Sequence, residues 1–179
     1  MAAAALNLQL PPGAGVVSGL SNQEVLARSQ LVILAIPYEA MAPTLSELKT
    51  LTADRILVST AVPMEFLAGV PHPATPEAGS ATEEVSRLCP DSVVVGAFHT
   101  VAAGQLLKLG QALDEDVLLT SDDAAAKDLV RALVGRIPGL RAVDAGPLSA
   151  ASFCERLTPF LLRLNRLHRA HTGIRITGL

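Results

Sequence analysis

Short apolar runs alternate along this chain with longer segments in which Leu, Val and Ala recur at helical spacing. The short runs are rich in Val, Ile and Leu without polar alternation, which is typical of strands that are covered on both faces. We expect strands at 31–36, 56–60, 92–97, 117–120 and 140–143. Because these runs alternate with helical segments, the pattern predicts βαβ units and a mostly parallel sheet of the α/β class.

The helical segments are expected at 22–29, 41–48, 81–89, 102–109 and 124–137, and a long last helix is expected from about 148 to 170. Ser21 suits the N-cap of the first helix, and Glu24 completes a capping box. Pro147 is expected at the first position of the last helix, where its missing N–H costs nothing. Repeated prolines and glycines between 63 and 79 predict an irregular surface loop.

Length and composition indicate one soluble globular unit, because half of the 179 residues are hydrophobic and can bury one core. Charged residues make up 17% of the chain and the net charge is -3, so no basic field favours nucleic acid or an anionic membrane. The apolar stretches are far shorter than the ~20 residues of a membrane span. The first residues lack the basic start of a secretory leader, which favours the cytoplasm. We expect Cys89 and Cys154 to be reduced core residues.

Two of the expected strands end in residues suited to contacting a ligand, at Ile36-Pro37 and at Phe98-His99. This pattern predicts a cofactor-binding sheet, but no G-x-G-x-x-G turn precedes the first of these strands. The segment 13–19 has two glycines at the right spacing and a serine where the third glycine should be. It follows two prolines rather than a buried strand, which favours a plain loop over a phosphate-binding turn.

A set of short blocks, taken together and in this order, resembles the NADPH-dependent coenzyme F420 reductase family. The blocks lie at 34–38, 57–63, 96–100, 144–148, 155–159, 165–168 and 171–178. The resemblance covers the chain from about residue 7 to the end. It implies a Rossmann-like, mostly parallel α/β fold with a long C-terminal helix, bound NADP and coenzyme F420, and a homodimer.

Family members carry a further strand, helix and strand with the phosphate-binding glycines, so by the resemblance this chain is N-terminally truncated. We therefore expect residues 1–147 to form a partial dinucleotide-binding domain. Residues 148–179 are expected to form a helix and tail that pack on that domain as one globular unit. Loss of central strands would bare an apolar edge, which predicts poor solubility or dimerisation of the chain.

The resemblance implies that hydride passes directly between nicotinamide and deazaflavin rings, which the protein needs only to orient. Ile36, Pro37, Ala61, Val62 and Pro63 would lie where strand ends meet the NADP ribose and nicotinamide. A flat nicotinamide needs apolar packing more than charge, which suits these residue types. Each proline pair is also consistent with simple strand termination.

His99 is the candidate catalytic residue, because the matching family histidine lies beside the deazaflavin ring. It would donate a hydrogen bond toward charge that develops there, although a histidine after a buried strand also suits the core. Val101 and Ala103 would follow as contacts to the ring. Thr158 would approach the same ring, or would bond back to the preceding turn beside a proline kink. Arg156 stands where some relatives have a small hydroxyl residue.

Arg163, Arg166 and Arg169 form a positive stripe along the last helix. The stripe suits the phosphate and glutamate tail of F420, or a solvated helix end whose cations complement the macrodipole. His168 and His171 have metal-like spacing, but no third ligand stands nearby and no metal is expected.

The sequence leaves three hypotheses open. The chain is an oxidoreductase that transfers hydride between NADPH and F420, or it is a truncated non-catalytic module for deazaflavin binding or dimerisation. In the third hypothesis the same scaffold serves another hydride-transfer substrate.

Overall fold

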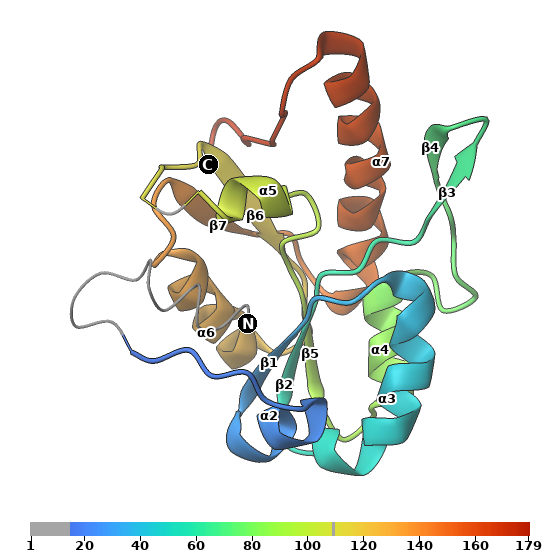
Figure 1. Ribbon diagram of the computed structural model, residues 1–179, viewed down its shortest axis with the longest axis vertical. Helices are drawn as coiled ribbons and strands as arrows, with labels where there is room; N and C mark the ends of the chain where they lie inside the picture. The colour runs from blue at the N-terminus through green and yellow to red at the C-terminus, as the bar shows by residue number, and fades with distance from the viewer. Residues whose placement is uncertain (1–14, 109) are drawn as a thin grey trace.

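The computed structural model describes residues 15–108 and 110–179, and it shows a central sheet with helices on both faces (Figure 1). Parallel strands lie in the order β1-β2-β5, which are β1 (Leu31–Leu34), β2 (Ile56–Ser59) and β5 (Val93–Gly96). A second parallel pair, β6 (Glu115–Leu119) and β7 (Leu140–Asp144), joins β5 through an antiparallel bridge between Gly96 and Thr120. The predicted α/β class is confirmed, and all five predicted strands form with ends that shift by one or two residues.

The helices also follow the prediction, with three corrections. They are α2 (Asn22–Arg28), α3 (Tyr38–Thr52), α4 (Ala81–Leu88), α5 (Ala103–Leu106), α6 (Ala124–Val134), the short 3-10 helix η1 (Leu148–Ala150) and α7 (Ala151–His168). The helix predicted at 41–48 begins earlier and ends later, while the one predicted at 102–109 has only four residues. The predicted last helix is split, because Pro147 caps η1 rather than opening the long helix.

The segment 63–79 is not an irregular loop, since it contains a β-hairpin of β3 (Met64–Leu67) and β4 (Val70–Pro73). Ala68 and Gly69 connect the strands with φ values of 49° and 75°, as the tight hairpin turns with positive φ at both central residues require. The prolines of β4 are tolerated because this ribbon has only two strands, so no further strand needs their missing N–H groups. The proline content that predicted a loop is thus compatible with an edge strand.

The core divides between the two faces of the sheet because neighbouring strand residues point to opposite sides. Leu57 and Val94 pack with α2, α3 and α4 on one face, and Val58 and Val95 pack with α6 on the other. Figure 1 shows α3 and α4 on one side of the strands and α6 on the opposite side. Cys89 and Cys154 are both free and buried, as predicted.

The N-terminal side of the described chain confirms the capping prediction. The backbone N–H of Glu24 donates to Ser21 Oγ, and the Glu24 carboxylate accepts from the Ser21 backbone at 2.9 Å.

Within the described residues, β1 pairs only with β2, so its other edge is open and Ile33 is 44% exposed. None of the described helices has the length and apolar content that a membrane crossing needs.

The C-terminal segment is fastened to β6 by one buried carboxylate. Asp116 is fully buried and accepts hydrogen bonds from Arg141, from Arg175 and from the backbone N–H of Ile176. The Arg141 guanidinium holds the pKa of Asp116 well below its usual range, because it stabilises the ionised form. In the other direction, the backbone N–H of Asp116 donates to the carbonyl of Ile174. The tail therefore lies along β6 as an ordered strap.

Candidate active site at the carboxyl edge of the sheet

A cleft of about 430 Å³ opens where β1 and β2 end and α3 begins. Its lining includes Ile36, Pro37, Ala61 and Val62, which are four of the five residues predicted to meet the nicotinamide half of NADP. The fifth, Pro63, is buried and does not line the cleft. The Thr60 hydroxyl, which also lines the cleft, donates to the carbonyl of Leu34 at 3.2 Å and ties the two strand ends together. This arrangement forms a mostly apolar slot at the edge where α/β sheets bind ligands.

Tyr38 lines this cleft and connects α3 to α4. Its hydroxyl donates to a carboxylate oxygen of Glu84 at 2.7 Å. Burial, together with this hydrogen bond and the negative charge of Glu84, raises the pKa of Tyr38 to about 12. The phenol is therefore protonated at neutral pH and holds the start of α3 in place.

His99 follows β5, and its ring lies inside the protein rather than facing open space. Its side chain is 2% exposed, with Nε2 3.5 Å from Thr82 Oγ1 and 3.9 Å from Glu155 Oε1. The other ring nitrogen, Nδ1, is buried without a hydrogen-bond partner. Burial lowers the pKa of His99 to about 4, so the imidazole is neutral at neutral pH. Phe98, just before it, has a φ of 61°, a strained value that turns the chain sharply at the strand end.

Glu155 is the residue of this site that sequence reasoning missed. Its carboxylate accepts from the backbone N–H groups of Ala81 and Thr82 at 2.9 and 3.0 Å, and from the Thr82 hydroxyl at 2.8 Å. It is 3% exposed, and burial raises its pKa while these hydrogen bonds act in the opposite direction. The sequence signal that could have identified Glu155 is a carboxylate on an apolar helix face, three residues before Thr158. Glu155 thus joins α7 to the start of α4, 3.9 Å from Nε2 of His99.

Thr158 bonds to the backbone of His99, while its expected contact with the deazaflavin ring stays a prediction. Its hydroxyl donates to the carbonyl of His99 at 2.7 Å. Since the single hydroxyl proton is used there, the alternative in which Thr158 bonds back to the preceding turn is wrong. Val101 is half-buried and packs on the core beside α6, whereas Ala103 is exposed at the start of α5. The structure therefore brings together His99 and Thr158, with Val101 two residues further along the same loop.

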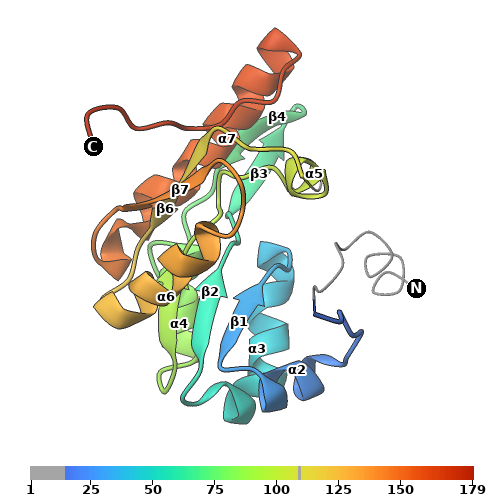
Figure 2. The ribbon, with the colours of Figure 1, turned by 90° about the vertical axis from the view of Figure 1, so that its left-hand side faces the viewer.

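A second, larger groove of about 930 Å³ lies between the β3–β4 hairpin and α7. Figure 2 shows α7 and the hairpin extending together away from the sheet. Arg156 lines this groove, and its guanidinium donates to Thr75 Oγ1 at 3.1 Å. The predicted stripe residues Arg163, Arg166 and Arg169 line it as well.

Two remaining sequence predictions concern a phosphate loop and a metal. The glycine segment 13–19 begins outside the described residues, and residues 15–20 have no regular secondary structure. In the described part of the chain, no three His, Cys, Asp or Glu side chains converge as metal ligands would. His168 is the last residue of α7, and His171 is exposed beyond it.

The parallel sheet, the helices on both faces and the slot at the carboxyl edge define a Rossmann-like α/β protein. The family described as "NADP oxidoreductase coenzyme F420-dependent" matches residues 3–63. The F420-dependent NADP reductase of Methanocaldococcus jannaschii is 36% identical over 166 residues, which cover 91% of this chain and 74% of that protein. The same-named protein of Methanothermobacter marburgensis is 34% identical and is covered to 75%. The chain belongs to the F420-dependent NADP reductase family.

A solved structure agrees with this assignment. The crystal structure described as that of a "putative f420 dependent nadp-reductase" from Arthrobacter sp. FB24 superimposes with a TM-score of 0.76 at 28% identity. The match covers 87% of this chain and 73% of the Arthrobacter chain. The chain thus spans about three quarters of the length of these relatives.

Proposed function

We propose that this chain acts in hydride transfer between NADPH and coenzyme F420. The observation that carries the proposal is the cleft that gathers Ile36, Pro37, Ala61 and Val62, in a chain of the reductase family. A mostly apolar slot of about 430 Å³, which Glu39 also lines, suits one flat ring of a cofactor where the two strand ends are tied together. The residues present therefore fit a nicotinamide, which supplies or accepts the hydride when it is bound.

The deazaflavin ring is proposed to lie against the loop after β5. Thr158 fixes the carbonyl of His99, and this bond sets the path of the backbone from His99 to Val101 and Ala103. His99 is neutral and buried, so it contributes as a positioning residue rather than as a charged acid. Thr82 and Glu155 both lie next to Nε2 of His99 and are bonded to each other. Pro63 is proposed to act through the conformation of the segment that carries Val62.

Residues 148–179 are proposed to act as one unit with the preceding domain. The bonds from Thr158 to His99 and from Ala81 and Thr82 to Glu155 support this view, because they fasten α7 to the sheet edge and to α4.

We also propose a homodimer, for which the open edge of β1 with its exposed Ile33 provides an apolar surface. Sedimentation of the purified chain tests this, and a monomer at all concentrations contradicts it. The two free cysteines support a cytoplasmic location.

The proposal is tested by titrating the purified chain with oxidised F420 and, separately, with NADPH. Both compounds are then added together, and hydride transfer is measured as the loss of deazaflavin absorbance. Binding of both with hydride transfer is the expected result. The chain contains no G-x-G-x-x-G sequence, so the NADPH titration is the decisive half. Binding of F420 alone overturns the reductase proposal and favours a non-catalytic deazaflavin-binding module. Binding of neither by folded protein overturns both.

A matched pair of variants locates the nicotinamide site. Val62→Asp places a charge in the apolar cleft and is expected to weaken NADPH binding at least tenfold while F420 binding is kept. Leu129→Asp, at an apolar residue of α6 that is 55% exposed, is the control and is expected to leave both titrations unchanged. Equal NADPH affinity in the two variants contradicts the assignment of the cleft.

A further inference from the structure

A chain of three buried polar side chains links α7, α4 and the loop that follows β5. Its members are Glu155, Thr82 and His99. Glu155 Oε1 accepts from the Thr82 hydroxyl at 2.8 Å, and Thr82 Oγ1 lies 3.5 Å from Nε2 of His99. Glu155 Oε1 is itself 3.9 Å from Nε2. The position of each proton in this chain therefore depends on its neighbour.

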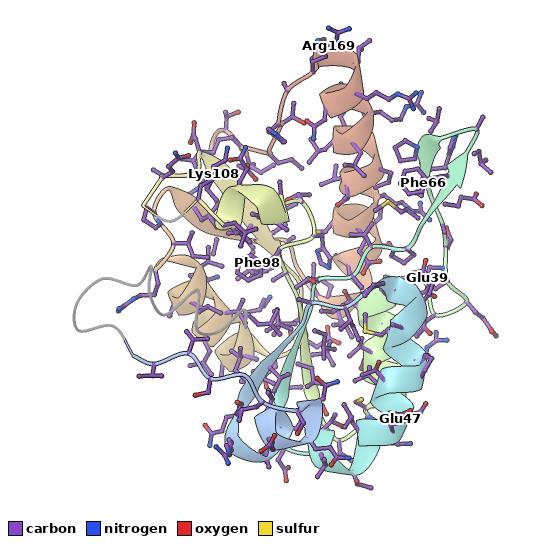
Figure 3. All side chains as sticks on the ribbon, viewed as in Figure 1. Glu39, Glu47, Phe66, Phe98, Lys108 and Arg169 are labelled. Carbon is purple, nitrogen blue, oxygen red and sulfur yellow. The ribbon has the colours of Figure 1, made fainter. Side chains whose placement is uncertain are left out.

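The backbone turn before His99 aims its ring at this polar pair. Phe98 has a φ of 61° and packs with the buried residues on the α6 face, and Figure 3 shows it near the carboxyl ends of the strands. His99, the next residue, reaches Thr82 and Glu155 on the α4 side. Its ring carbon Cε1 lies against Gly96, 3.1 Å from the position that a Cβ would take. A nitrogen of the ring, and not a carbon, thus faces the hydroxyl and the carboxylate.

The donors around Glu155 determine the direction of the hydrogen bonds. Two backbone N–H groups at the start of α4 and the Thr82 hydroxyl all donate to this carboxylate. These bonds favour its ionised form, and so does the positive end of the helix dipole. An ionised carboxylate has no proton to give, so the single hydroxyl proton of Thr82 is directed to Glu155. Thr82 Oγ1 is then left with lone pairs and can only accept from His99.

This direction distinguishes the two tautomers of the neutral imidazole. With its proton on Nε2, the ring donates a long hydrogen bond to Thr82 Oγ1 and faces the negative charge of Glu155. With its proton on Nδ1, Nε2 and Oγ1 would face each other as two acceptors. The Nδ1–H group would also be a buried donor without a partner among the described residues, which costs free energy. The geometry therefore favours the Nε2–H tautomer, with a lone pair on Nδ1.

We propose that Glu155, acting through Thr82, is a positioning residue that holds His99 in the Nε2–H tautomer and leaves Nδ1 as a hydrogen-bond acceptor. Only an N–H or O–H group can then bond to Nδ1, which differs from the donor role that the sequence predicted for this histidine. The same helix also fixes the main chain here, because Thr158 donates to the carbonyl of His99. The tautomer is a property of the free chain, so the proposal goes beyond the proposed function and does not depend on it.

Nuclear magnetic resonance of the imidazole nitrogens and carbons tests the proposal in the full chain without any cofactor. The chain has four histidines, and the signals of His99 are those that disappear in His99→Gln. At pH 7 the wild type is expected to show one neutral tautomer, with the proton on Nε2. A proton on Nδ1 overturns the proposal, because it means that Glu155 is protonated and that the hydrogen bonds run in the reverse direction. A mixture of both tautomers overturns it as well.

Three variants separate positioning from a purely structural role. Glu155→Gln removes the negative charge that faces Nε2 and is expected to give a mixture in which the Nδ1–H form is measurable. Thr82→Ser retains the hydroxyl and should keep the single Nε2–H tautomer. Ser80→Ala removes the N-cap of the same helix and has no contact with the ring, so it should lower the melting temperature and leave the tautomer unchanged.

The outcomes of these measurements are independent of the cofactor titrations. A single Nε2–H tautomer in Glu155→Gln would show that packing alone selects it, and would overturn the role of the carboxylate. Thermal unfolding shows which variants are folded, and the wild-type spectrum decides the matter if Glu155→Gln is not. An Nε2–H ring in a chain that binds neither F420 nor NADPH supports the positioning proposal, while the proposed function fails.

Discussion

Protonation of His99 should couple stability to pH, because its imidazole is neutral and buried. Its pKa is about 4 in the folded chain and ~6.5 in the unfolded chain. The unfolded state therefore binds more protons between these values, and the free energy of unfolding falls as pH drops from ~6.5 toward 4. His99 alone contributes a slope of up to ~1.4 kcal/mol per pH unit.

The variant His99→Gln is expected to flatten this slope, as measured by urea unfolding at pH 7 and pH 5. His171→Gln, at an exposed histidine, serves as the control and should keep the wild-type slope. A slope in His99→Gln equal to that of the wild type would show that the buried imidazole is not its source.

Loss of the Glu155 carboxylate should destabilise the chain strongly. Glu155→Ala leaves two backbone N–H groups at the start of α4 and the Thr82 hydroxyl without their acceptor. We expect a loss of about 3 kcal/mol, because unmet buried donors are costly. Glu155→Gln retains an acceptor oxygen and should cost less. Glu47→Ala, on the exposed face of α3, should change the free energy of unfolding by under ~0.5 kcal/mol. Equal losses in the Glu155→Ala and Glu47→Ala variants would refute this role.

Close packing around Gly96 gives another residue-scale prediction. A Cβ at this position would lie 2.5 Å from Thr120 Oγ1, 3.0 Å from Thr82 Oγ1 and 3.1 Å from His99 Cε1. Gly96→Ala is therefore expected to cost about 1–3 kcal/mol and to disturb F420 binding. Gly104→Ala, where no atom lies within 4 Å, should be neutral or slightly stabilising. Denaturant unfolding of both variants measures the difference.

The gathering of the cleft residues could be predicted from the sequence, whereas the contacts of Glu155 could not. Ile36, Pro37, Ala61 and Val62 lie just after apolar runs, and the ends of parallel strands meet at one edge, so local pattern predicts that they gather. The partners of Glu155 are 73 and 74 residues away in the chain. A carboxylate in a helical pattern is normally a solvated position, and no local rule shows that another helix start will meet it.

At the scale of elements, the strap on β6 predicts a large effect of one carboxylate. Asp116→Ala leaves Arg141, Arg175 and the N–H of Ile176 without their common acceptor. We expect a loss of about 3 kcal/mol in unfolding and faster proteolysis of the last eight residues. Asp114→Ala removes only an ion pair to Arg175. Because the Asp114 side chain is 87% exposed, this variant should lower the free energy of unfolding by less than ~1 kcal/mol. A protease-resistant tail in the Asp116 variant would contradict the strap.

Elements with strong hydrophobic periodicity were predicted well, and the hairpin was not. Continuous runs of Ile, Leu and Val define β2 and β5 because both faces of these strands are covered. In the hairpin, Pro71 and Pro73 obscure the strand pattern, and Phe66 and Leu67 remain exposed instead of marking a core. The ribbon forms because it packs on α7, with Arg166 bonded to Gly69 at its turn. That stabilisation is tertiary and leaves no local signal.

At the scale of the whole molecule, the β3–β4 hairpin lies between the cleft at the sheet edge and the groove along α7. Met64 and Phe66 of β3 line the cleft, while Val70, Pro71 and Pro73 of β4 line the groove. The sequence predicted the fold class, but not the strand order, nor the antiparallel bridge through which β6 joins β5. These depend on which segments pack together, and hydrophobic period does not encode that choice.

The position of Tyr38 gives the molecule a built-in optical reporter. The chain has one tyrosine and no tryptophan, so its near-ultraviolet emission comes from a single phenol that lines the cleft. The carboxylate of Glu84 accepts a hydrogen bond from that phenol, so movement of α3 against α4 changes the environment of the emitter. Entry of a ring into the cleft would register as a change in tyrosine emission, without any label.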